Sequence, residues 1–472
     1  MEKLNSNIKY RSMEKLKIRV LSIFILVVIV ALTTSCDSTI KKRSDQKENN
    51  NQLHAYWTRN ANIYEVNIRQ FTDEGSINEF RKQLPRLKKM GVDILWIMPI
   101  HPIGEVNRKG TLGSYYAVKD YKQINPEFGS IEDLRNLVDE AHNLGMYVIL
   151  DWVANHSAWD NPWATRHPDW YKKDEDGNFV SPYDWTDVIA FDYNNPVLRD
   201  SMMDALKFWV SETDIDGYRC DVAGMVPVEF WNRVRYELDS IKPVFMLAED
   251  EDNDDLLREA FDMNYGWKLH HIMNEIAQGK QNSNDIWDYF DWNDSKYPSN
   301  SYRMYFTSNH DENSWNGTVQ ERMGDAGEVM AVLSYTIPGM GMIYNGQEAG
   351  LNKRLAFFEK DTISWDEMPY NNLYSTLNKL KKDNPALWNG KYGGAIIRLG
   401  NESNQSVFAF YRKADNNTVI SVLNLTDKPQ SLEFENSNIN GYYNDVFGEE
   451  KFRIEGKTEI NLNPWGYLVL VK

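Results

Sequence analysis

The chain has 472 residues, of which 42% are hydrophobic and 26% charged, as in a globular protein with one large domain and one or two small ones. Its formal net charge of −17 disfavours nucleic acid and anionic lipid as ligands and favours a neutral one, so we expect no nucleic-acid partner. The only two cysteines are Cys36 and Cys220, which excludes a zinc site built on several cysteine ligands.

The N-terminus has the pattern of an export signal. Lysines and arginines precede an apolar run from Val20 to Leu32 that is short for a membrane span, although a retained anchor helix is the alternative interpretation. Thr33-Thr34-Ser35-Cys36 follows and resembles the cleavage box of bacterial lipoproteins. This resemblance implies a signal peptide over residues 1–35, a lipid on Cys36, and a protein anchored to a bacterial membrane, in the periplasm or at the cell surface. The polar residues 36–53 read as a flexible tether.

From residue 61 to residue 345 the sequence alternates apolar strand segments with amphipathic helices. One helix is expected to begin at a capping box around Ser76, to bend at Pro85 and to end at Gly91. A second helix has the same signals, with a capping box at Ser130 and a stop at Gly145.

Eight strand segments can be counted, and the sixth has the weakest pattern. Because they are apolar throughout and separated by helices, they predict a parallel sheet, and their number predicts closure into a (β/α)8 TIM barrel over residues 54–388. The segments are Ile63–Val66, Ile94–Met98, Tyr147–Trp152, Gly217–Asp221, Val244–Ala248, Phe261–Asn264, Arg303–Thr307 and Gly341–Asn345.

Two regions depart from this alternation. Residues 156–196 are rich in Trp, Asp, Pro and Tyr and are predicted to form a short, loop-like insertion after the third strand. Residues 389–472 alternate polar and apolar positions, which predicts a C-terminal antiparallel β-sandwich domain. The strands expected there are Ser406–Arg412, Thr418–Leu425, Ser431–Phe434 and Gly466–Val471.

Three carboxylates lie at or just after predicted strand ends, where a barrel enzyme carries its active site. They are Asp221, Glu249 and Asp311. A lone carboxylate in such a place is most often a cap or a surface charge. Two that flank one bond can instead cleave a glycosidic linkage, one as nucleophile and one as acid. Arg219 lies on the same side of its strand as Asp221 and is expected to keep that carboxylate ionised and oriented.

The motifs around these residues resemble the signature of the α-amylase family of glycoside hydrolases. They are Asp151-Trp152-Val153-Ala154-Asn155-His156, Gly217-Tyr218-Arg219-Cys220-Asp221, Leu247-Ala248-Glu249 and Ser308-Asn309-His310-Asp311, with Gly346-Gln347-Glu348 further on. The resemblance implies that Asp221 is the nucleophile, Glu249 the general acid/base, and Asp311 the group that fixes the sugar ring. It also implies that Tyr116 stacks under that ring and that Asp151 is mainly structural.

Further substrate contacts are predicted from His156 and His310, whose rings can hydrogen-bond to sugar hydroxyls. The insertion carries four tryptophans that are candidates either for sugar stacking or for packing of the loop. They are Trp159, Trp163, Trp170 and Trp185.

One motif departs from the family. Many starch-cleaving members carry a Lys-His pair after the nucleophile, which binds glucan on the leaving-group side and helps to hold calcium. Here Val222-Ala223-Gly224-Met225 follows Asp221. Asn155 remains as a candidate calcium ligand, with Asp184, Asp187 or Asp192 to assist, but these do not assemble into the set of oxygens that calcium needs. We therefore expect that no cofactor is required, with calcium bound through Asn155 as the alternative.

The sequence thus predicts a hydrolase that cleaves α-1,4 bonds of starch, maltodextrin or related oligosaccharides with retention. The small residues Ala223-Gly224 leave the leaving-group side open, and this pattern is closer to that of relatives that act on maltodextrins, cyclodextrins or pullulan. Two alternatives remain at this point. One is an α-glucan transglycosylase of the branching or glucanotransferase type, and the other is a starch-binding surface protein without catalysis.

Overall fold

The computed structural model describes residues 54–472. The predicted signal peptide, the tether and the lipid-bearing Cys36 lie outside the described residues. Among the described residues, no helix combines the length and the apolar character that a membrane span requires.

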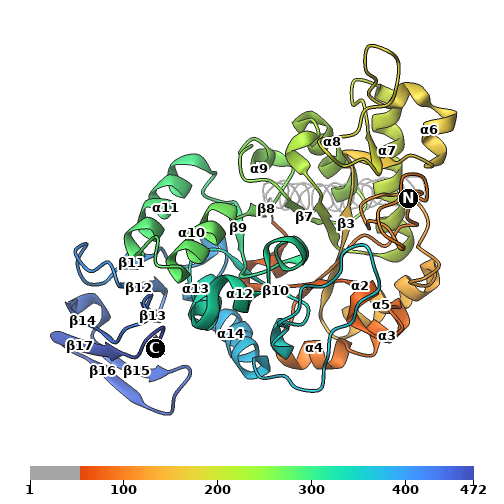
Figure 1. Cartoon of the computed structure of the whole chain (residues 1–472). Coiled ribbons are helices and arrows are strands. Elements are labelled where there is room, and N and C mark those ends of the chain that lie inside the picture. Colours follow the sequence, from red (N-terminus) through yellow and green to blue (C-terminus); the bar gives the residue numbers. More distant parts are fainter. Residues whose placement is uncertain (1–53) are drawn as a thin grey trace, which may run out of the picture. The chain divides into compact units, whose positions relative to one another are not determined.

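Eight parallel strands close into a barrel, which confirms the predicted fold (Figure 1). Around the barrel the order is β1-β10-β9-β8-β7-β6-β3-β2, so that β1 pairs with both β2 and β10. The strands are β1 (Ile63–Val66), β2 (Ile94–Ile97), β3 (Tyr147–Trp152), β6 (Gly217–Cys220), β7 (Phe245–Ala248), β8 (Met263–Tyr265), β9 (Tyr302–Tyr305) and β10 (Met340–Tyr344).

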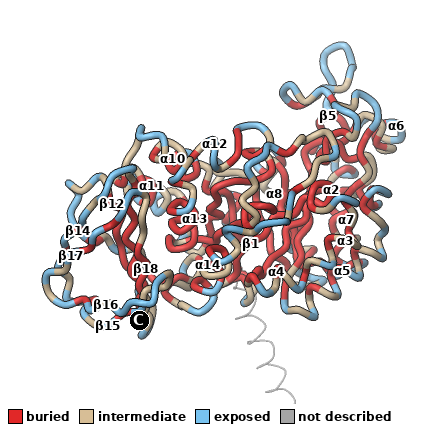
Figure 2. Tube along the Cα trace, turned by 60° about the horizontal axis from the view of Figure 1, so that its bottom comes forward, coloured by how far each residue is buried: buried red, intermediate tan, exposed pale blue. Residues whose placement is uncertain are grey.

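The strands are buried on both faces, as their apolar sequences require (Figure 2). The barrel interior is filled by large side chains from most of the strands, among them Trp96, Phe245 and Met304. The outward-facing side chains pack against the helices in a second, larger cluster.

The helices of the barrel follow the strands along the chain. They are α2 (Ile68–Phe71), α3 (Ile77–Arg81), α4 (Leu84–Met90), α5 (Ile131–Asn143), α7 (Pro196–Thr213), α8 (Val228–Asp239), α9 (Leu256–Glu259), α10 (Trp267–Ala277), α11 (Ser283–Lys296), α12 (Val319–Met323), α13 (Gly327–Thr336) and α14 (Asn371–Asp383). Shorter turns include the 3-10 helix η3 (Ala223–Met225) and the π-helix η4 (Glu312–Asn316).

The structure confirms some of the helix boundaries predicted from the sequence. Ser130 and Asp133 form the predicted capping box of α5, and Gly91 ends α4 with a φ of 88° that favours glycine. Pro85 does not bend one helix, because the chain forms two helices, α3 and α4, and Pro85 lies in the first turn of α4. That turn tolerates proline because its backbone N–H groups lack helical partners in any case. The sixth strand, β8, ends one residue beyond the predicted segment.

The insertion after β3 has little regular structure. A two-stranded antiparallel sheet, β4 (His156–Ala158) and β5 (Val188–Ala190), joins its two ends. Between these strands lies the five-residue helix α6 (Pro162–Arg166), and α7 begins at Pro196. Aromatic contacts fill the space that regular packing leaves, for example between Trp163 and Trp170.

The C-terminal region is antiparallel, as predicted. Its six-stranded sheet has the order β11-β12-β13-β18-β15-β16, and β14 pairs with β17 in a second sheet. Side chains of both sheets share one apolar core, for example Ile420 from the first and Phe434 from the second. The strands are β11 (Ile397–Arg398), β12 (Val407–Ala414), β13 (Asn417–Asn424), β14 (Gln430–Glu435), β15 (Gly441–Asp445), β16 (Lys451–Ile454), β17 (Lys457–Leu462) and β18 (Tyr467–Val471).

Candidate active site

The three predicted carboxylates meet at the carboxyl-terminal rim of the barrel. Asp221 directly follows β6 and Glu249 directly follows β7, the neighbouring strand. Asp311 lies beyond β9 and immediately before the π-helix η4. All three line one cavity of about 540 Å³. Parallel strands end at the same rim, and this brings residues far apart in the sequence to one place.

One guanidinium group connects the carboxylates at the floor of this cavity. Arg219 is fully buried, and its Nη1 donates hydrogen bonds to Asp151 (2.9 Å) and Asp221 (3.1 Å). Its Nη2 lies 2.8 Å from Oε1 of Glu249, which forms an ion pair. The second oxygen of Glu249 accepts a hydrogen bond from the backbone N–H of Val222 (2.8 Å). The two carboxylates expected to do the chemistry are therefore held by the same planar cation.

The sequence predicts that Arg219 keeps the Asp221 carboxylate ionised, but in the structure other effects on its pKa act against this. Burial raises the pKa of Asp221 well above its ordinary value, and the neighbouring Glu249 raises it further, while Arg219 acts in the opposite direction. The charge on Glu249 therefore disfavours ionisation of the Asp221 carboxyl, and the guanidinium of Arg219 favours it.

A buried chain of polar groups fixes the other side of the cavity. The Tyr116 hydroxyl contacts Nε2 of His310 (2.7 Å), and Nδ1 of His310 contacts Glu65 on β1 (2.6 Å). Tyr116 also donates to Asp151 (3.1 Å), which links this chain to Arg219. Burial lowers the pKa of His310, but the carboxylates of Asp311 and Glu65 outweigh burial and raise it to about 9. His310 is therefore a cation at neutral pH.

His156 lines the same cavity in a different state. Burial lowers its pKa to about 3, so the ring is neutral and can both donate and accept a hydrogen bond. Its ring meets Trp185 edge-on, at 5.4 Å between centroids. Of the four tryptophans in the insertion, Trp185 is the one that lines the cavity, while Trp159, Trp163 and Trp170 lie elsewhere among the aromatic contacts of the insertion.

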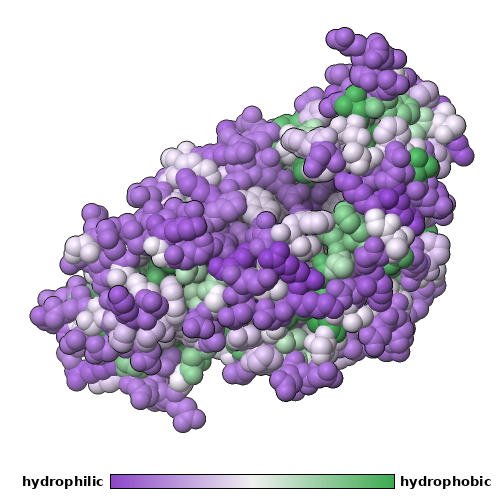
Figure 3. Space-filling view, in the orientation of Figure 1, coloured by the Kyte–Doolittle hydropathy of each residue, from purple (hydrophilic) through white to green (hydrophobic). Residues whose placement is uncertain are grey.

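Three aromatic residues that sequence reasoning missed complete the cavity wall. Phe357 lies nearly parallel to Tyr116, at 6.3 Å and 14°, and Trp315 and Phe358 contact Phe357. Trp315 is 50% exposed, so one edge of this wall is open to a ligand. The face of the molecule shown in Figure 3 is mainly hydrophilic, with scattered hydrophobic patches. No local sequence signal marks these residues, because η4 and the segment after β10 meet only in the folded chain.

Two other buried residues could have been found from the sequence. Glu65 is a carboxylate within an otherwise apolar buried strand, and such a residue usually has a partner, here His310. Trp96 donates its indole N–H to Asp151 (3.1 Å) from the neighbouring strand β2. Glu348 of the fifth motif does not line the cavity. It is buried against Tyr64 and Arg86.

The candidate calcium ligands do not converge. Asn155 is buried with its amide 3.4 Å from the ring of His156, and Asp187 forms an ion pair with Lys109 (3.3 Å). Asp192 caps the backbone of Asn194. Within residues 54–472, no three His, Cys, Asp or Glu side chains are grouped as metal ligands. These candidate residues therefore do not together supply the six to eight oxygens that calcium needs.

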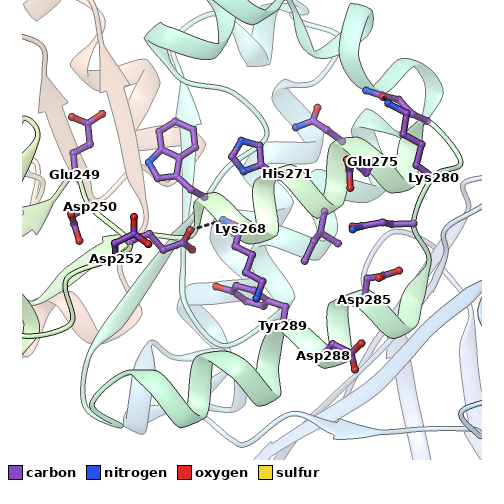
Figure 4. A pocket seen from close by; sticks show the side chains of 16 residues that line it. Glu249, Asp250, Asp252, Lys268, His271, Glu275, Lys280, Asp285, Asp288 and Tyr289 are labelled. Carbon is purple, nitrogen blue, oxygen red and sulfur yellow. Dashed lines mark hydrogen bonds between the residues drawn. The ribbon is translucent and has the colours of Figure 1, made fainter. Parts of the chain in front are cut away.

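A larger cavity of about 960 Å³ begins at Glu249 and runs along α10 and α11 (Figure 4). Figure 4 shows Glu249 at one side of it, His271 in its middle and Lys280 at the far side. Among the described residues, Glu249 is the one that lines both this cavity and the cavity of Asp221. The predicted acid/base group therefore lies where the two cavities adjoin.

Two family models match the chain. The model for the alpha amylase catalytic domain matches residues 42–188 and 165–395. The model for the maltogenic amylase C-terminal domain matches residues 397–469. Together they account for the barrel, the insertion and the antiparallel domain.

Similar proteins of known structure match most of this chain. A maltogenic alpha-amylase from Thermotoga neapolitana is 31% identical with a TM-score of 0.80, over 87% of this chain and 98% of that one. An alpha-amylase from Lactobacillus plantarum is 30% identical with a TM-score of 0.79, over 88% and 99%. The alpha-amylase MalA from Haloarcula japonica is 25% identical over 395 residues, and the match spans 57% of that protein's length.

Proposed function

Since the chain belongs to the alpha-amylase family, we propose that it is a retaining α-glucan hydrolase that cleaves α-1,4-glucosidic bonds of starch, maltodextrin or related oligosaccharides. The observation that supports this most is the guanidinium of Arg219, which holds the carboxylates of Asp221 and Glu249 together at one cavity. A retaining mechanism needs two carboxyl groups on opposite sides of one bond, at short separation.

The proposed reaction has two steps. Glu249 gives its proton to the glycosidic oxygen while Asp221 attacks the anomeric carbon, so that the C–O bond breaks and a glycosyl ester of Asp221 forms. The shortened glucan leaves as an alcohol. Glu249, now a carboxylate, takes a proton from water, and the resulting hydroxyl displaces Asp221 from the anomeric carbon. Both carboxyl groups return to their first states, and the configuration is retained.

The other residues of the cavity would bind and orient the ring at the cleaved bond. Tyr116 offers an aromatic face for stacking, and His156 is a neutral hydrogen-bonding partner for hydroxyls. His310 is a cationic donor, and Asp311 is an acceptor with 38% of its side chain exposed. Carboxylates beside the ring suit a transition state in which positive charge develops at the anomeric carbon.

The experiment that tests this proposal measures the release of reducing sugar from maltoheptaose by the Asp221→Asn and Glu249→Gln variants. Each substitution removes one of the two reacting carboxyl groups at nearly constant size. We expect kcat to fall by about 10³-fold or more in each variant, because a covalent step or its proton transfer is lost. Unchanged thermal unfolding would show that the fold is kept. A variant with full activity would refute the assignment, and binding of maltoheptaose without cleavage by the unmutated protein would favour a non-catalytic binding protein.

A second candidate is transglycosylation by the same carboxylates. The cavity of about 960 Å³ that begins at Glu249 offers space for an acceptor sugar, which would replace water in the second step. Sizing of the products from maltoheptaose separates the two functions. Products longer than the substrate, or branched ones, would favour the transferase, and only shorter products would favour the hydrolase.

We further propose that the protein is exported and anchored to a bacterial membrane by a lipid on Cys36. The support is the sequence pattern of residues 1–36, a basic head, a short apolar run and small residues before the cysteine. In cells, Cys36→Ser is expected to abolish incorporation of labelled palmitate and to release the protein from the membrane fraction. Membrane association that survives this substitution would favour the retained anchor helix instead.

A further inference from the structure

The segment after the nucleophile offers no polar side chain to the sugar on the leaving-group side. Gly224 and Met225 stand where many starch-cleaving relatives carry the Lys-His pair. A Cβ atom on Gly224 would lie 2.0 Å from a carboxylate oxygen of Asp250, so Asp250 occupies the space of any side chain at that position. Recognition of the leaving group must therefore come from another element that lines the cavity beyond Glu249.

The helix α10 presents an aromatic surface to that cavity. The ring of Trp267 is stacked with those of Tyr265 (5.2 Å, 27°) and His271 (6.2 Å, 24°). Trp267 and His271 are four residues apart, which places both on one face of the helix. Trp267 is partly buried, whereas His271 is exposed. Both side chains line the cavity.

This surface is fixed relative to the reacting carboxylates. The hydroxyl of Tyr265 accepts a hydrogen bond from Nε of Arg219 (3.1 Å), the residue that pairs with Asp221 and Glu249. A sugar that stacks on Trp267 and His271 would therefore be held in a defined position with respect to Glu249, which contacts the glycosidic oxygen in the proposed reaction.

The lining of the cavity selects the chemistry of the ligand. Carboxylates of Asp250, Glu275 and Asp285 line it and can accept hydrogen bonds from hydroxyl groups, while they repel an anion. Flat rings beside such acceptors fit a neutral polyhydroxyl ligand that has an apolar face, as a glucose unit has.

We propose that this cavity binds the leaving-group part of the α-glucan and that Trp267 and His271 form its sugar-stacking surface. This inference rests on the proposed function and extends it. The two residues would determine how strongly the enzyme prefers long glucans, since each glucose unit beyond Glu249 adds contacts that Gly224 and Met225 do not supply.

The test compares two substrates, maltoheptaose and 4-nitrophenyl α-maltoside. The second has an aryl group in place of glucose on the leaving-group side. We expect the ratio of kcat/KM for maltoheptaose to kcat/KM for the aryl maltoside to fall about tenfold in Trp267→Ala and about threefold in His271→Ala. Trp267→Phe keeps a flat ring and should recover most of the ratio.

His167→Ala is the matched control. His167 also stacks on a tryptophan, Trp170 (4.0 Å, 8°), but it lines neither cavity, so its removal should leave the ratio unchanged. If Trp267→Ala fails to fold, the exposed His271 decides the question. An unchanged ratio in His271→Ala and in any folded Trp267 variant would overturn the inference while leaving the proposed function intact. If the unmutated protein cleaves neither substrate, the proposed function fails and the inference fails with it.

Discussion

The two cavities that adjoin at Glu249 are built in different ways. Around Asp221 the side chains are buried and bonded to one another, as the contacts of Arg219 and His310 show. Beyond Glu249 the cavity is lined by one face of α10 and by charged side chains with access to water, such as Lys268 and Asp288. The side chains of the first cavity are held in place before a ligand binds, while the second cavity offers the ligand a surface that is accessible to water.

This difference indicates which part of the reaction each cavity serves. Charges that act on a developing transition state are effective when they are fixed and shielded from water, because they then need no reorganisation. Recognition of a long neutral chain needs surface area and hydrogen-bonding groups more than fixed charge. Substitutions in the first cavity should therefore affect kcat strongly, and those at the ligand-facing walls should mainly affect KM.

After the loss of a reacting carboxyl group, the largest effect is expected from Arg219→Lys. Lysine keeps the positive charge but cannot contact Asp151, Asp221 and Glu249 from one planar group. We expect kcat on maltoheptaose to fall by about 10²–10³-fold, because the two carboxylates lose their common orientation. Steady-state kinetics measures this effect.

Arg412→Lys is the control for this prediction. Arg412 is equally buried, but its guanidinium donates to backbone carbonyls, including those of Ile337 and Gly394, and it lines neither cavity. It should lower the melting temperature by several degrees and leave kcat within about twofold. Equal losses of kcat in the two variants would mean that Arg219 acts only through stability.

The predicted part of the site consists of residues whose position follows from their own strand. Asp221 and Glu249 directly follow strands whose apolar patterns are clear, so the sequence alone places both at one rim. The barrel was predictable for the same reason, since eight apolar segments recur with helices between them. The segment with the weakest pattern, Phe261–Asn264, still identified strand β8, although the strand begins two residues later and ends one residue later than predicted.

The missed part depends on how distant segments pack. Glu65 contacts His310 because β1 closes the barrel beside β10, although the two residues are separated in the sequence by nearly the whole length of the barrel domain. Phe357 joins Tyr116 and Trp315 from a segment without regular structure, where no periodicity exists to be read. In the C-terminal domain, β15 to β17 were missed because their exposed positions carry many charged and polar residues and their apolar positions are few.

A second prediction concerns the aromatic wall of the Asp221 cavity. Trp315→Ala removes the exposed ring that contacts Phe357 and Phe358. We expect KM for maltoheptaose to rise about five- to tenfold with kcat changed less, because a stacking surface for bound sugar is lost. Trp159→Ala, in the insertion and outside the cavity, should leave KM unchanged. A loss in kcat alone would show that Trp315 supports the reacting groups instead of binding substrate.

A third prediction uses the raised pKa of His310. Because its pKa is about 9 in the folded protein and 6.5 ordinarily, the protonated ring contributes stability that is complete below about pH 6.5 and disappears as the pH rises through 9. The contribution is at most about 3 kcal/mol. The fall in melting temperature between pH 7 and pH 9.5 should therefore shrink in His310→Asn. In His101→Asn it should not, because burial lowers the pKa of His101 to about 4 and that ring is neutral throughout this range.

The smallest effect is expected from chelation of calcium. The ammonium group of Lys109 lies 3.3 Å from the carboxylate of Asp187 in the insertion, so a cation of the protein itself already neutralises a carboxylate that could have helped Asn155 to bind calcium. A divalent cation there would face Lys109 and too few oxygens. We therefore expect EDTA to change neither kcat nor the melting temperature, and added calcium to restore nothing. Lys109→Ala removes the competing cation. Stabilisation by calcium that appears only in this variant would show that the ion pair occupies the place of a metal. Loss of activity of the unmutated protein in EDTA would instead show that a calcium site exists outside the donors named above.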